Sequence, residues 1–140
     1  MNVKASALAL GLIFLAGCSS KSGGDIEELR KAPASLSEVS ELLHGGGPRG
    51  GPANQLSDLD KNKHLFPRGY QAVKNGDIII LWGVRPMGEG DVAKGASQEI
   101  VAYEKKVPTE GGYVLYSGGM MKRMTADEFK AAPKAGKPSS

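Results

Sequence analysis

The segment from Ile78 to Trp82 reads Ile-Ile-Ile-Leu-Trp, and it constrains the fold more than any other part of the chain. A strand with one face in water alternates apolar and polar residues, whereas this run is apolar on both faces, which is typical of a strand covered on each side. It follows Asn75-Gly76, a dipeptide that accepts positive φ at both central positions of a type I′ turn. The sequence therefore predicts a hairpin of strands at Tyr70–Lys74 and Ile78–Trp82, with the second as the central strand of a sheet.

Three further strands and a final helical turn complete the predicted sheet domain. The strands are expected at Glu99–Lys105, Tyr113–Tyr116 and Met120–Met124, which are short apolar runs bounded by turn residues. Thr125 and Glu128 have the spacing of a capping box, so a short helix is expected to follow the last strand.

A glycine- and proline-rich segment divides the chain before the sheet. Ser35 and Glu38 have capping-box spacing, and an apolar stripe at helical spacing follows them. The stripe consists of Leu36, Val39, Leu42 and Leu43. Gly45–Pro52 then holds five glycines and two prolines, a composition that disfavours helix and strand. We expect a short helix that docks on the sheet, followed by a hinge.

The N-terminal segment has the order of features of an export signal. Lys4 is followed by an uncharged apolar stretch from residue 5 to residue 15, and small residues lead to Cys18. The stretch is too short to span about 30 Å of hydrocarbon as a helix, but it has the length of a signal-peptide apolar region. The sequence therefore predicts an exported protein.

The last residues of this segment, Leu15–Cys18, resemble the lipobox of bacterial lipoproteins. The resemblance implies that signal peptidase II cleaves before Cys18, that its thiol carries diacylglycerol and that its amine is acylated, for example with palmitate. Ser19 stands where an Asp favours inner-membrane retention. The resemblance thus implies a membrane-anchored lipoprotein of the cell envelope, with the outer membrane or its periplasmic face favoured.

Taken together, these features predict five regions. They are a signal peptide (1–17), the lipidated cysteine with its tether (18–34), a short helix with the hinge (35–54), a small domain (55–132) and a disordered basic tail (133–140). The expected fold class is α+β, with a small antiparallel sheet of about five strands and short flanking helices.

The C-terminal half carries a second resemblance. Val101–Pro108, Gly111–Lys122 and Thr125–Phe129 are similar to the end of type II secretion pseudopilin-like proteins with an H-x9-D-G motif. This resemblance implies a shared sheet element. Gly118 stands where the family has Asp, and Pro108 where its His would fall, so no functional residue carries over.

Charge and motif content argue against several function classes. Removal of residues 1–17 takes only Lys4 from the 18 basic residues, so 17 − 15 leaves a net charge of +2, which does not indicate a nucleic-acid-binding protein. No nucleophile stands in a catalytic motif, and His44 and His64 lack metal-ligand spacing. We expect no catalytic residue, no metal and no cofactor.

Two basic dipeptides are the remaining charge feature: Lys105 with Lys106, and Lys122 with Arg123. Cations on strand edges commonly prevent edge-to-edge pairing. Alternatively, if their strands are neighbours, the four side chains share one edge and contact an anionic partner, such as peptidoglycan, another anionic envelope polymer or a lipid headgroup. An envelope protein is the other class of partner expected.

The function expected from the sequence is that of a lipid-anchored envelope protein acting as a non-catalytic binding or structural module. Two alternatives stay open. One is a small envelope enzyme or accessory subunit with a site at the loop 85–97, because loops of that length are often functional. The other is a component associated with a secretion system, as the pseudopilin-like segment suggests.

Overall fold

A computed structural model of the chain describes residues 31–84, 86–87 and 99–138. The predicted signal peptide, Cys18 and most of the loop 85–97 lie outside the described residues.

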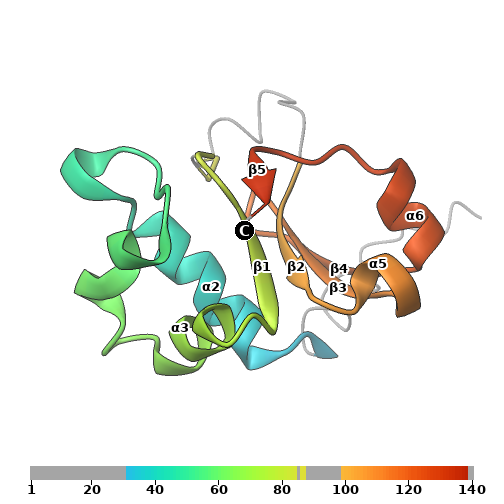
Figure 1. Cartoon of the computed structure of the whole chain (residues 1–140), viewed down its shortest axis with the longest axis horizontal. Coiled ribbons are helices and arrows are strands. Elements are labelled where there is room, and N and C mark those ends of the chain that lie inside the picture. The colour runs from blue at the N-terminus through green and yellow to red at the C-terminus, as the bar shows by residue number, and fades with distance from the viewer. Residues whose placement is uncertain (1–30, 85, 88–98, 139–140) are drawn as a thin grey trace, which may run out of the picture.

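The centre of the molecule is an antiparallel sheet with the strand order β4-β3-β2-β1-β5 (Figure 1). Its strands are β1 (Ile78–Trp82), β2 (Ile100–Glu104), β3 (Gly112–Tyr116), β4 (Met121–Met124) and the two-residue β5 (Lys137–Pro138). Helices accompany the sheet, so the predicted α+β class is confirmed.

Helices cover both faces of the sheet (Figure 1). On one face lie α2 (Ala34–His44) and α3 (Pro67–Lys74), and on the other α5 (Val107–Glu110) and α6 (Ala126–Ala131). Two 3-10 helices connect α2 to α3. They are η1 (Pro48–Gly50) and η2 (Leu56–Asn62).

The apolar stripe predicted for the first helix is confirmed. Leu36, Val39, Leu42 and Leu43 are all exposed by 5% or less. They belong to one core with residues of the sheet, among them Ile78, Ile80, Val101 and Leu115. A sheet face must be covered to exclude water, and α2 supplies that cover.

This core corrects the predicted division of the chain. Because α2 and the sheet share one set of buried side chains, the folded domain includes α2 rather than beginning at residue 55. Gly45–Pro52 therefore connects two parts of one core and does not separate two bodies. Its backbone is also bonded internally, since Gly47 N donates to Gly51 O at 2.7 Å.

A second, smaller core lies on the opposite face of the sheet. It consists of Ile100, Val107, Val114, Met124 and Phe129. The rings of Tyr103 and Phe129 meet with their centroids 4.7 Å apart, which holds α6 against β2. The prediction that Phe129 lies in a last helix after Thr125 is confirmed.

The capping box predicted for α2 is wrong. The N-cap is Pro33, without a side-chain bond, and Glu38 has a different role. Its carboxylate accepts hydrogen bonds from Arg68 Nε at 2.7 Å and from Gly69 N at 2.8 Å, in the first turn of α3. Desolvation acts to raise the pKa of Glu38, but the bonds from Gly69 and Arg68 together hold it below its usual value.

The predicted hairpin at Asn75-Gly76 is also wrong, because the residues before it form α3. Asn75 has φ −80° and only Gly76 has positive φ, at +78°. Gly76 N donates to Val73 O at 3.0 Å and Asp77 N to Ala72 O at 2.8 Å. These two bonds are those of a Schellman motif, so the dipeptide ends a helix instead of turning a hairpin.

The position of β1 differs from the predicted one as well. Its apolar residues are largely buried, but β1 lies next to the edge and β2 is the central strand. Within the described residues, the outer side of β1 pairs at Leu81 and Trp82 alone, with β5. β5 comes from the tail that the composition predicts to be disordered, where Ala135 is buried and its N–H donates to Ile100 O at 3.0 Å.

The Schellman motif makes a prediction that separates it from a hairpin. Gly76→Ala is expected to lower the free energy of unfolding by about 1–2 kcal/mol, because the left-handed conformation strains a Cβ although the space around it is open. Asn75→Ala is expected to change it by less than about 0.5 kcal/mol, since Asn75 is right-handed. Denaturant unfolding of both variants measures this. A type I′ hairpin needs positive φ at both residues, so equal losses would contradict the account.

Candidate functional site

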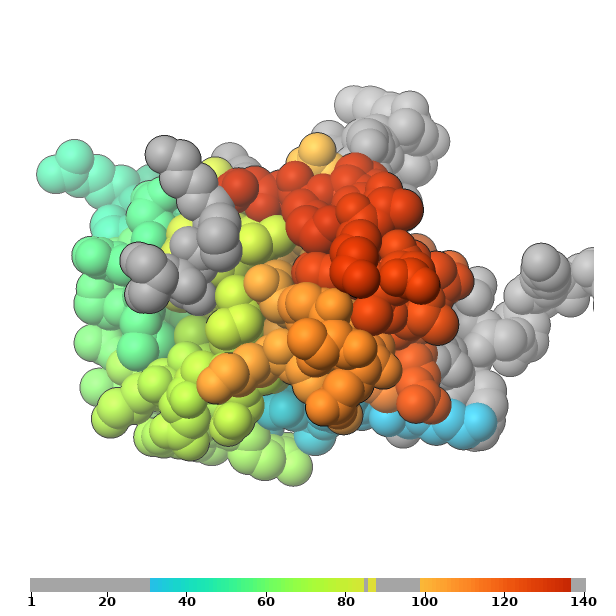
Figure 2. All heavy atoms as spheres, turned by 45° about the vertical axis from the view of Figure 1, so that its right-hand side comes forward, coloured from blue at the N-terminus to red at the C-terminus, as the bar shows by residue number. Residues whose placement is uncertain are grey.

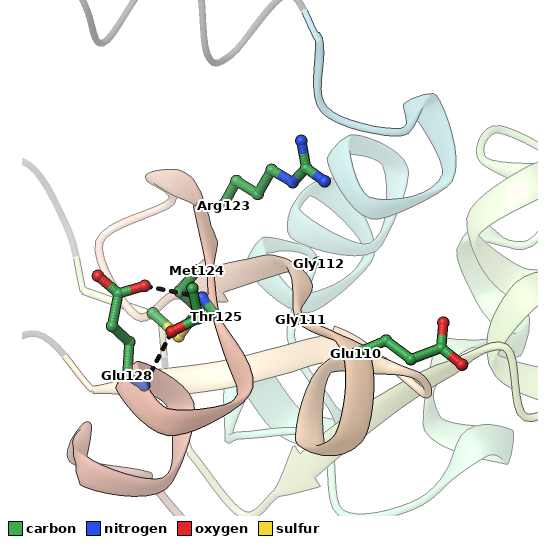
Figure 3. A pocket seen from close by; sticks show the side chains of 7 residues that line it. All are labelled: Glu110, Gly111, Gly112, Arg123, Met124, Thr125 and Glu128. Atoms are coloured by element: carbon green, nitrogen blue, oxygen red, sulfur yellow. Dashed lines mark hydrogen bonds between the residues drawn. The ribbon is translucent and has the colours of Figure 1, made fainter.

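One open pocket lies where α5, β3, β4 and α6 meet, at the end of the sheet at which β2 and β4 finish (Figure 3). Its volume is about 390 Å³. The lining residues are Glu110, Gly111, Gly112, Arg123, Met124, Thr125 and Glu128. It combines bare backbone with charged side chains, and we take it as the candidate site.

Two glycines form the bare backbone of the pocket, and at Gly111 the backbone of β4 leaves no room for a side chain. Gly111 has φ +78°, and a Cβ there would lie 2.7 Å from Met124 O. A Cβ on Gly112 would lie 2.6 Å from Glu104 Oε2. Larger residues would therefore collide with β4 or with the Glu104 carboxylate. Backbone at Gly111 and Gly112 thus lines this part of the hollow.

The Glu104 carboxylate beside Gly112 has a structural role. Its Oε2 accepts a hydrogen bond from Tyr113 N at 2.7 Å, and its Oε1 lies 3.7 Å from Lys106 Nζ. The carboxylate thus stabilises the start of β3, and Lys106, one of the four predicted cationic contacts, is paired within the chain.

Glu128 is held in the capping box predicted for α6, which is confirmed. Glu128 N donates to Thr125 Oγ1 at 3.2 Å, and Thr125 N donates to Glu128 Oε2 at 2.7 Å. The bond from the Thr125 backbone is the main reason that the pKa of Glu128 lies below its usual value, and Lys122 adds a smaller electrostatic contribution. This carboxylate is accordingly engaged at the helix start.

The charged side chains of the pocket do not meet. In Figure 3, Glu110, Arg123 and Glu128 extend in three different directions from the two glycines. Acid–base or nucleophilic chemistry requires two such groups within hydrogen-bond reach of the same reacting atom.

The four predicted cations do not form one edge. Lys105 and Lys106 follow β2, whereas Lys122 and Arg123 lie on β4, and β3 stands between those strands. Strands that share an edge would have to be neighbours, so the expectation of one shared edge is corrected. All four side chains are exposed, and Arg123 alone of them lines the pocket.

The two histidines lie apart. His44 is the last residue of α2, with Nδ1 2.8 Å from Ser40 O. His64 is exposed between η2 and α3. Within residues 31–84, 86–87 and 99–138, no three His, Cys, Asp or Glu residues gather as metal ligands. In the same residues no helix has the length and apolar character needed to cross a membrane.

Sequence reasoning missed the glycine pair and the role of Glu104. Both depend on how α5 crosses the start of β3, which no local pattern reveals. The signal present in the sequence was Gly111-Gly112 directly before a strand, since adjacent glycines often mark a close approach of backbone.

Comparisons of the chain with protein-family models, curated proteins and solved structures find no significant match. The lipoprotein and pseudopilin resemblances of the sequence accordingly stay predictions.

The capping box leads to a test of how Glu128 is engaged. In Thr125→Ala the hydroxyl acceptor is lost and the box loosens, so the pKa of Glu128 is expected to rise toward its usual value. Side-chain NMR titration of wild type and variant measures the shift, with Thr109→Ala as the control because the Thr109 hydroxyl donates to Lys106 O, away from Glu128. An unchanged Glu128 titration in Thr125→Ala would show that the box does not hold this carboxylate.

Proposed function

We propose that this chain is a lipid-anchored protein of the cell envelope whose folded domain is a non-catalytic binding module. The observation that carries the proposal is the sequence Leu15–Cys18 at the end of an apolar stretch of signal-peptide length. Two or more acyl chains hold a protein stably on a bilayer, whereas one holds it only reversibly. A diacylated Cys18 is therefore a sufficient anchor.

The position of the domain along the chain supports this proposal. Its first described helix begins at Ala34, and 34 − 18 places that residue sixteen positions after Cys18. The intervening residues include the Gly- and Ser-rich run 19–24, a composition typical of linkers. The anchor and the domain are thus separate parts of the chain.

The binding role is supported by what the charged residues around the pocket do. Glu104 and Glu128 accept backbone hydrogen bonds, and Lys106 pairs with Glu104. These groups stabilise the end of the sheet and are not available as a catalytic pair. Arg123 is exposed and, among the described residues, makes no ion pair, which suits it to an external partner.

The anchor is tested by replacing its cysteine. When the full chain is expressed in bacteria with an alkyne fatty-acid probe, the wild type is expected to incorporate the label and to lose residues 1–17. Cys18→Ala is expected to incorporate none and to keep its full length, because both lipid attachment and cleavage require that thiol. Gel fluorescence and intact mass measure the two effects.

Ser19→Ala is the matched control, since it changes the neighbouring position and leaves the cysteine in place. It is expected to be labelled like the wild type. Equal labelling of wild type and Cys18→Ala, or a wild type that carries no lipid, would overturn the proposed anchor.

A further inference from the structure

The outer side of β4 is an open sheet edge. β4 is the first strand in the order of the sheet and pairs only with β3 among the described residues. An open edge presents unpaired N–H and C=O groups, which are a template for another extended chain. Both faces of the sheet are covered by helices, so a chain that joins the sheet adds at an edge, and β4 is the edge strand on this side.

The register of the β3–β4 hairpin identifies which backbone groups point outward. Tyr116 N donates to Met120 O at 2.8 Å, so these two residues form a hydrogen-bonded pair. Such pairs alternate along an antiparallel ladder, and Lys122 and Met124 therefore bond inward to β3. Met121 and Arg123 direct their N–H and C=O groups to the open edge.

The side chains of β4 give this edge a positive charge on both faces. Met121 packs against the core beneath α2, and Met124 against the core beneath α5 and α6. Because side chains alternate along a strand, Arg123 lies on the first of these faces and Lys122 on the second. An added strand thus meets a cation on each face.

A second copy of this chain fits the edge poorly. Antiparallel pairing of two β4 edges through the outward groups allows two registers that pair three residues. The first register places Lys122 of one copy opposite Lys122 of the second copy. The second register places Arg123 of one copy opposite Arg123 of the second copy. Like charges directly opposite each other destabilise a strand pair. The two cations thus disfavour self-pairing while favouring acidic side chains.

The pocket adjoins the same edge. Arg123, Met124 and Thr125 line it, so the end of β4 leads directly into a hollow of about 390 Å³. In recognition by strand addition, backbone bonds supply affinity and adjoining pockets select side chains. The edge and the pocket together are the two parts that this mode needs.

We propose that β4 binds an extended, acidic segment of a partner protein, which adds antiparallel or parallel to the sheet. Met121 and Arg123 bond to its backbone, and its acidic side chains meet Lys122 on one face and Arg123 on the other. The identity of the partner as an envelope protein rests on the proposed function. The contact itself does not, because it depends only on the folded domain.

The test uses the purified full chain in detergent and an array of synthetic peptides of about ten residues, a length that covers a strand and its flanks. Acidic content and β-branched content are varied independently. We expect the bound peptides to be enriched in alternating Glu or Asp and Val, Ile or Thr. No bound peptide, or bound peptides without acidic enrichment, would overturn the proposal.

Backbone N-methylation distinguishes strand addition from simple charge attraction. The best peptide is N-methylated at every second residue, in each of the two possible phases. The peptide methylated on the N–H groups that face β4 is expected to bind at least about tenfold more weakly than the parent peptide, because those hydrogen-bond donors are removed. The peptide methylated on the other N–H groups is expected to bind like the parent. Equal binding of both phases would contradict strand addition.

Substitutions in the protein locate the peptide-binding contact. Arg123→Glu is expected to weaken peptide binding about tenfold or more, since a cation becomes an anion. Lys130→Glu is the control, because Lys130 lies on α6 and pairs with Asp127, away from the β4 edge. Circular dichroism checks that both variants are folded. Equal effects of the two substitutions would overturn the assignment to β4.

Two other occupants are distinguished in the same experiments. Binding to vesicles containing anionic lipid, with no peptide bound, would show a membrane surface in place of a protein strand. A dimer of the wild type that dissociates on Met121→Pro would show a second copy on the edge. If the wild type carries no label at Cys18 but still binds peptide, the proposed anchor is overturned and the proposed strand addition is not.

Discussion

The rest of the structure depends on the close crossing of α2 and α3. Gly69, in the first turn of α3, lies against the backbone of α2, where a Cβ on it would be 2.7 Å from Glu38 Cβ and 2.9 Å from Val39 N. Only a glycine allows the two helices to approach this closely. The Glu38 carboxylate then reaches the start of α3 and accepts hydrogen bonds from Arg68 and Gly69.

This crossing sets the position of α2 and therefore the size of the core. A small domain has little apolar surface to bury, and α2 adds four buried apolar side chains to the face of the sheet. α3 in turn ends in the Schellman motif at Gly76 and leads directly into β1. With both faces of the sheet covered, the β4 edge and the glycine-lined pocket beside it are the surfaces that we propose meet a partner. Figure 2 shows the orange and red C-terminal part of the chain gathered on one side, away from the green residues around η2.

Those elements that carry a local signal could be predicted from the sequence. The stripe of α2, the Thr125–Glu128 capping box and the strands at β1 to β4 each follow from spacing within a few residues. The hairpin prediction at Asn75-Gly76 was wrong because the dipeptide suits a type I′ turn and also a helix C-terminus. Pro67, at the first position of α3, was the neighbouring signal for a helix.

The remaining features are set by contacts between distant segments. Strict alternation would place Val101 and Ala102 on opposite faces, but a register shift in β2 brings both into the core beneath α2. The order of the strands puts β3 between the two basic dipeptides, which spacing along the chain does not reveal. The pocket likewise depends on two glycines whose neighbours come from β2 and β4.

The most direct measurement of the central claim, that α2 and the sheet form one core through this crossing, is the equilibrium unfolding of Gly69→Ala. Helix propensity alone predicts a gain in stability of about 0.5–1 kcal/mol for alanine in a helix. The account predicts a loss of about 1–3 kcal/mol, because the methyl group meets backbone that has no room to move. Gly51→Ala is the control, since its φ is −79° and the nearest atom to a Cβ there is 3.6 Å away. A single transition shifted to lower denaturant in Gly69→Ala alone supports the account, whereas a gain in stability, or a separate early transition of α2 in the wild type, contradicts it.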